Sequence, residues 1–127
     1  RLQVMSEESI FMFQSFEDLE VWKRSCQLAV KIYEVMRDSR DYGLRDQMQR
    51  AAVSIASNIA EGSEGSNKEF ARYLKIASGS AAELRTQTYI ASRVGLIELE
   101  QMREIIDECQ QISKMIYGLR KSLNTEN

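Results

Sequence analysis

The stretch that decides the fold is residues 66–91, which read SNKEFARYLKIASGSAAELRTQTYIA. Apolar and small residues recur in it at alternating steps of four and three, namely Phe70, Leu74, Ala77, Ala81, Leu84, Thr88 and Ala91. This spacing forms one apolar stripe along an α-helix and does not fit the two-residue period of a strand. The pattern predicts a helix over residues 67–94 that begins with a capping box between Ser66 and Glu69 and ends at Gly95.

Three further stretches carry the same spacing and predict helices over residues 17–37, 44–61 and 98–123. Ser15 is the expected N-cap of the first, and Gly62 is the expected left-handed residue after the second. The predicted core-facing residues of the first helix are Leu19, Trp22, Cys26, Ala29, Tyr33 and Met36. Turns of roughly two to six residues make neighbouring helices antiparallel. The predicted fold class is therefore all-α, an antiparallel up-down-up-down four-helix bundle.

Length and composition fit one such domain. The chain has 127 residues and no proline, which is typical of long helices with short connections. We expect the bundle to occupy residues 15–123, with a C-terminal tail at 124–127. Because the chain begins with Arg1, residues 1–14 are interpreted as an N-terminal extension, either disordered or foreign to the natural protein. The two cysteines form no metal or disulfide spacing, no stretch is long enough to span a membrane, and a cytoplasmic protein with reduced thiols is expected.

The sequence offers little for catalysis. It has no histidine, which removes the commonest general base and the commonest zinc ligand, and it has no phosphate-binding glycine loop. No catalytic residue, metal, cofactor or small-molecule substrate is therefore predicted. An enzyme that uses Glu61 and Glu83 is the least favoured of the function classes.

Polar residues near the predicted core leave two interpretations open. Glu61 shares a helical stripe with Gln47, Arg50 and Ser54, and Asn58 borders the same core face. Glu83 shares a stripe with Ser80 on the next helix. They form either a polar site between helices or a hydrogen-bonded network that fixes helix register or a subunit contact. The network is favoured, because half-buried polar groups need partners.

Apolar residues outside the predicted core stripes also leave two interpretations open. On the first helix these residues are Val21, Leu28, Ile32 and Val35. They indicate either a wide core or a surface buried between subunits. Since contiguous exposed apolar surface is unfavourable in a monomer, a homo-oligomer is favoured.

Several motifs resemble one protein family. They are FEDLEVW at residues 16–22, YGLRDQ at 42–47, RAAVSI at 50–55, SNIAEG at 57–62, EFARYL at 69–74, and GS at 79–80 followed by EL at 83–84. Over about residues 16–121 the chain resembles the bacterial four-helix-bundle proteins encoded by intervening sequences in 23S ribosomal RNA genes. The polar family-motif positions are Gln47, Ser54, Asn58, Glu61, Gly62, Ser80 and Glu83.

That resemblance implies an up-down bundle that assembles as a homopentamer, without established enzymatic activity. It also implies a link to the accessory variability proteins of diversity-generating retroelements, which are basic pentamers that bind RNA and reverse transcriptase. This sequence departs from the pattern because it lacks the family's usual prolines, one of them at Ala56, and because its formal net charge is −2. We therefore expect a homo-oligomer that binds RNA or a ribonucleoprotein, and a protein-binding scaffold is the alternative. The candidate RNA-binding residues are Arg45, Arg50, Lys68, Arg72 and Lys75.

Overall fold

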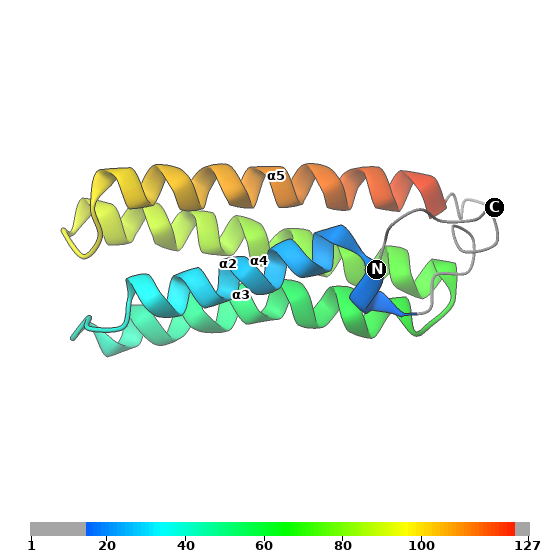
Figure 1. The fold of residues 1–127 in the computed structure, drawn as a ribbon, viewed down its shortest axis with the longest axis horizontal. Helices are drawn as coiled ribbons and strands as arrows, with labels where there is room; N and C mark the ends of the chain where they lie inside the picture. The colour runs from blue at the N-terminus through cyan, green and yellow to red at the C-terminus, as the bar shows by residue number, and fades with distance from the viewer. Residues whose placement is uncertain (1–14, 124–127) are drawn as a thin grey trace.

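A computed structural model of the chain describes residues 15–123. A short 3₁₀ turn, η1 (Phe16–Asp18), precedes four α-helices: α2 (Glu20–Val35), α3 (Tyr42–Ser63), α4 (Asn67–Arg93) and α5 (Leu99–Leu123). The helices run alternately up and down in one bundle (Figure 1), and the described range contains no strand. The predicted all-α four-helix bundle is confirmed. The predicted extension at 1–14 and tail at 124–127 lie outside the described residues.

Each helix packs against its neighbours in sequence. The contact between α3 and α4 is the most extensive, followed by α4 with α5 and then α2 with α3. The contact between α2 and α5, which closes the ring, is the least extensive of the four. The α3–α4 pair is thus the most extensively packed part of the bundle.

The core stripe predicted for α4 is correct along its whole length. All seven of its residues are buried: Phe70, Leu74, Ala77, Ala81, Leu84, Thr88 and Ala91. Thr88 lies in this apolar core because its hydroxyl donates to the carbonyl oxygen of Leu84 at 2.7 Å, which leaves no unsatisfied polar group. Facing residues of the other helices are buried as well, including Met48, Ile55, Ile105 and Ile112.

The core stripe predicted for the first helix is correct in part: Ala29 and Met36 are buried and Leu19 and Trp22 pack against the core, but most of the buried residues lie one position earlier. The buried residues of α2 are Val21, Ser25, Leu28, Ala29 and Ile32, and the predicted core residue Tyr33 is 47% exposed. Periodicity alone could not decide, because the helix carries two apolar stripes side by side. The polar Ser25 hid the true stripe, and its hydroxyl is satisfied by donating to the carbonyl oxygen of Val21 at 2.7 Å. Trp22 and Cys26 are only half-buried as a result.

The start of the first helix also differs from the prediction. Ser15 caps η1 and not an α-helix, since its hydroxyl accepts from the backbone N–H of Glu17 at 3.1 Å. Leu19 then takes an extended conformation, and α2 begins after it. This break places the ring of Phe16 edge-on to that of Trp22, with centroids 5.1 Å apart. The helix was predicted to begin at residue 17, but residues 16–18 form the 3₁₀ turn η1, and the Phe16 ring packs against Trp22.

The two ends of α4 follow the predicted signals closely. The hydroxyl of Ser66 accepts from the backbone N–H of Glu69 at 3.1 Å, which is one half of the predicted capping box. The carboxylate of Glu69 lies against Gly65. At the other end Gly95 has a φ of 82°. The N–H of Leu96 donates to the carbonyl oxygen of Ala91 at 2.8 Å, so α4 ends in a Schellman motif.

Gly62 has a different role from the predicted one. It is a buried residue inside α3 and is not a left-handed cap, because α3 continues to Ser63. A Cβ placed on Gly62 would lie 2.5 Å from the Cβ of Tyr73 on α4. Glycine is therefore needed here for the close approach of two helix backbones.

We predict that Gly62→Ala destabilises the protein by about 1–3 kcal/mol, because the added methyl group overpacks the contact with Tyr73. Gly118→Ala is the matched control: nothing lies within 4 Å of a Cβ at that position, and alanine favours the helix by roughly 0.5–1 kcal/mol. Urea unfolding of both variants gives the comparison. Equal stability of the two variants would contradict the assigned role of Gly62.

Candidate functional site

The described part of the chain contains no obvious catalytic centre. No group of three or more histidine, cysteine, aspartate or glutamate residues within residues 15–123 is arranged to hold a metal ion. Cys26 and Cys109 are both free thiols. Burial raises the pKa of Cys109 to about 12 and also raises the pKa of Cys26, so neither thiol is activated as a nucleophile.

Within residues 15–123, none of the four helices is both long enough and apolar enough to cross a lipid bilayer.

Three of the predicted polar residues meet between α3 and α4. The hydroxyls of Ser54 and Ser80 are 2.9 Å apart. The amide of Asn58 donates to the carbonyl oxygen of Ser54 at 2.8 Å and to its hydroxyl at 2.9 Å. This geometry is a network that ties the two helices in one register.

The other predicted polar residues do not join this network. Gln47 and Glu61 are exposed on α3. Glu83 accepts a hydrogen bond of 3.3 Å from Gln87, which is only 6% exposed and was not predicted. The sequence does contain a signal for Gln87: it follows Ser80 by seven residues and Glu83 by four, which places the three side chains on one face of the helix.

The five candidate RNA-binding residues fall into two groups. Arg45 and Arg50 lie early in α3, whereas Lys68, Arg72 and Lys75 lie early in α4. Because the helices are antiparallel and Ser54 faces Ser80, the two groups occupy opposite halves of the bundle. Arg45 and Lys68 are separated by about 30 Å along the axis at 1.5 Å per residue. The structure therefore does not bring the five side chains into one patch.

Two of these arginines are stacked on tyrosine rings. The guanidinium of Arg45 lies 4.8 Å from the ring centroid of Tyr42 and also pairs with Asp46 at 3.2 Å. The guanidinium of Arg72 lies 4.7 Å from the ring centroid of Tyr73. Stacking of this kind holds the cation in a fixed position on the surface.

An apolar hollow lies between α2 and α3, and we call it the α2–α3 groove. It has a volume of about 370 Å³ and is lined by Phe16, Trp22, Cys26, Ala29, Val53, Ala56, Ser57 and Ala60. An adjoining hollow of about 540 Å³ shares Val53 and Ser57 and extends to Tyr33 and Arg50. Trp22 is half-buried and packs against the core where it lines this groove.

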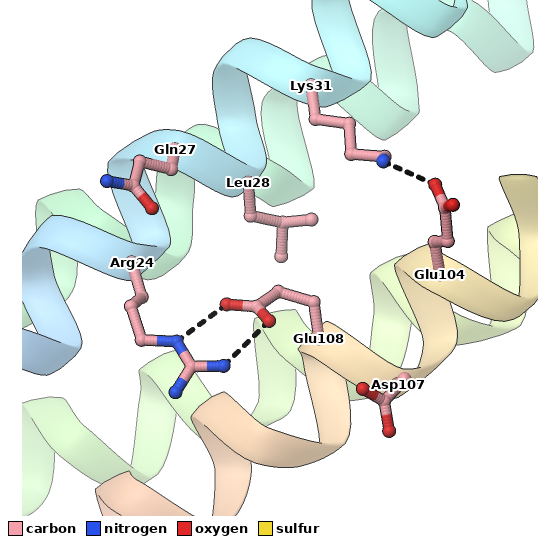
Figure 2. A pocket seen from close by; sticks show the side chains of 7 residues that line it. All are labelled: Arg24, Gln27, Leu28, Lys31, Glu104, Asp107 and Glu108. Carbon is pink, nitrogen blue, oxygen red and sulfur yellow. Dashed lines mark hydrogen bonds and ion pairs between the residues drawn. The ribbon is translucent and has the colours of Figure 1, made fainter.

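A charged seam joins α2 to α5, and Figure 2 shows it from close by. The guanidinium of Arg24 donates to both carboxylate oxygens of Glu108, at 2.8 and 2.7 Å. Lys31 pairs with Glu104 at 2.6 Å. The hydrogen bond to Glu108 raises the pKa of Arg24 above its ordinary value. These pairs bridge the two helices whose direct contact is least extensive, so we interpret the seam as structural.

Comparison with known families identifies the chain. The model of a family described as 23S rRNA-intervening sequence protein matches residues 17–118. The chain belongs to this family. The 23S rRNA-intervening sequence proteins are thus the group that the motifs at residues 16–84 indicated, and the description of this family names no enzymatic activity.

One solved structure supports the same assignment. It is that of a protein with unknown function from the S23 ribosomal protein family of Bacteroides thetaiotaomicron. It is 26% identical in sequence with a TM-score of 0.75, and the match covers 80% of this chain and 98% of that chain. No curated protein matches the chain.

We predict that Glu108→Gln lowers the free energy of unfolding by about 0.5–1 kcal/mol at low salt, because a partly exposed bidentate pair is lost. In 1 M salt, where the screening length is about 3 Å, most of this difference should disappear. Glu100→Gln on the same helix is the control, since Glu100 forms no ion pair within the described residues. A double-mutant cycle that combines Glu108→Gln with Arg24→Gln measures the coupling free energy between the two side chains. A coupling free energy of zero would contradict the structural role of the seam.

Proposed function

We propose that this 23S rRNA-intervening sequence protein is a non-catalytic, cytoplasmic homo-oligomer that binds RNA. Membership of a family named for a ribosomal RNA element is the observation that carries the proposal. The exposed cations of α3 and α4 support it, because phosphate neutralisation supplies much of the affinity for RNA. The absence of histidine from the sequence argues against acid–base catalysis.

The α2–α3 groove supports the oligomeric part of the proposal. Val53 is 41% exposed on α3, and Trp22 is half-buried beside it, so apolar surface is open to solvent. The small residues Ala56, Ser57 and Ala60 allow a helix of a second copy to approach closely. We propose that copies of the chain meet at this groove and form a pentamer, the stoichiometry that the family resemblance implies.

Assembly through the groove is tested by Val53→Glu, which places a charge where the groove and the adjoining hollow share a residue. We expect this variant to run as a monomer in light scattering, whereas the natural sequence has the mass of five chains. Val94→Glu is the matched control, because Val94 is 61% exposed and lies outside the groove.

The thiol of Cys26 gives an independent measurement of the same assembly. Cys26 lines the groove, so its reaction with a thiol reagent should be slower in the oligomer than in the Val53→Glu monomer. A Val53→Glu protein that keeps its oligomeric mass and leaves Cys26 equally protected would overturn the groove as an interface.

RNA binding is tested by fluorescence anisotropy with a structured 23S ribosomal RNA fragment at several salt concentrations. We expect Arg50→Glu/Arg72→Glu to weaken binding about tenfold or more and to flatten the salt dependence, since phosphate contacts are lost. The control Arg40→Glu/Arg103→Glu has the same change in charge. If the natural sequence binds no RNA at any salt concentration, the RNA-binding proposal is refuted. The remaining function would then be that of a protein-binding scaffold, which the apolar α2–α3 groove favours.

A further inference from the structure

Positive charge is concentrated at one end of α4 and α5. Residues 70–82 of α4 and 109–123 of α5 contain no acidic residue, although the whole chain has a formal net charge of −2. These two segments carry five bases: Arg72, Lys75, Lys114, Arg120 and Lys121. Lys68 adjoins them at the start of α4.

Two observations show that these segments lie opposite each other. Near the start of α4, Ala71 lines a hollow of about 210 Å³ together with Tyr117, Arg120 and Lys121 of α5. Further along, the guanidinium of Arg85 lies near enough to Cys109 to oppose the rise in thiol pKa that burial causes. Because α4 and α5 are adjacent and antiparallel (Figure 1), residues 70–82 run alongside 109–123.

Five bases and Tyr117 form two exposed rows. Lys68, Arg72 and Lys75 follow the i, i+4, i+7 spacing of one helix face, and Lys114, Tyr117 and Lys121 follow the i, i+3, i+7 spacing of another. All six side chains are exposed. Each row is about 10 Å long at 1.5 Å per residue, and packed helices lie about 8–10 Å apart. We call these six residues and Arg120 the α4–α5 basic surface.

An open aromatic ring and an unpaired donor lie within this surface. Tyr117 is 60% exposed, and the ammonium of Lys121 is 5.8 Å from its ring centroid. The Nε of Arg120 is buried without a hydrogen-bond acceptor in the described part of the chain. An exposed ring beside a row of cations is typical of surfaces that bind single-stranded nucleic acid, because a base stacks on the ring while cations contact phosphates.

Among the described acidic residues at this end of the bundle, Glu69 lies in the first turn of α4, and Glu61 and Glu64 lie at the end of α3 and in the turn that follows it. The carboxylate of Glu69 lies against Gly65 in the turn between α3 and α4. The acidic turn η1 packs on α2 and α3 and makes no comparable contact with α4 or α5. The α4 half of the basic surface thus has one acidic neighbour in sequence, Glu69, between Lys68 and Arg72, whereas residues 109–123 of α5 contain none.

We propose that the α4–α5 basic surface binds a single-stranded segment of RNA, with its cations on the phosphates and Tyr117 stacked on a base. This inference rests on the proposed function and deepens it. It places the RNA on α4 and α5 and leaves Arg45 and Arg50, in the other half of the bundle, outside the site, so that Arg72 accounts for the effect expected of Arg50→Glu/Arg72→Glu.

The test compares two double variants of equal charge by fluorescence anisotropy with a labelled twelve-nucleotide uridine oligomer. Lys114→Glu/Lys121→Glu changes the proposed surface, and Arg45→Glu/Arg50→Glu changes the other basic group. We expect the first to weaken binding at least tenfold and the second less than twofold. Loss of two phosphate contacts should also reduce the slope of log affinity against log salt by about 1.4.

Stacking is tested separately at Tyr117. We expect Tyr117→Ala to weaken binding about fivefold or more and Tyr117→Phe to bind like the natural sequence, because both aromatic rings stack. Tyr89→Ala, on an exposed tyrosine in the second half of α4, is the matched control and should have no effect. Circular dichroism confirms that each of these surface variants is folded.

The outcomes separate this inference from the proposed function. If the natural sequence binds the oligomer but the α5 double variant or Tyr117→Ala binds equally well, the site is elsewhere and the inference is overturned, while RNA binding stands. If the natural sequence binds neither the oligomer nor the structured RNA fragment at any salt, the proposed function itself falls.

Discussion

The close approach of α3 to α4 is the constraint on which the rest of the structure depends. Gly62 has no room for a side chain against Tyr73, and the hydroxyls of Ser54 and Ser80 lie in hydrogen-bonding contact. Such a contact admits one register and one rotation of α4 about its axis. That rotation determines which residues of α4 enter the core beside Leu84 and which face α5. The α2–α5 contact, by contrast, is less extensive and includes partly exposed ion pairs such as Arg24 with Glu108.

This geometry explains how an acidic chain presents a basic surface. Net charge is a property of the whole sequence, whereas a phosphate backbone meets only one face of the fold. The helix pairing places the acid-free segments 70–82 and 109–123 side by side, and η1 carries its acids to α2 and α3. The α2–α3 groove occupies another part of the surface, so assembly and RNA binding need not compete.

The sequence predicted features that depend on a single helix better than those that depend on two. The core stripe of α4 and the cap at Ser66 were correct, because spacing and capping chemistry act locally. The stripe of α2 was correct only in part, since the choice between its two apolar faces is made by neighbouring helices. Gly62 was misassigned for the same reason: its neighbour Tyr73 lies on another helix. The α4 residues of the basic surface, Lys68, Arg72 and Lys75, were among the predicted RNA-binding candidates, but the α5 residues beside them could not be foreseen, because their placement requires the register between helices.

The most direct test of this account is native-state hydrogen exchange, which measures the free energy at which each amide opens. If the α3–α4 contact is the foundation of the bundle, the slowest amides will lie around Ser54 and Ser80 and exchange only by global unfolding. The amides of α2, which packs less extensively, will then open at a lower free energy. Amides of α2 that are protected as strongly as those around Ser54, or faster exchange in the middle of α3, would contradict the account.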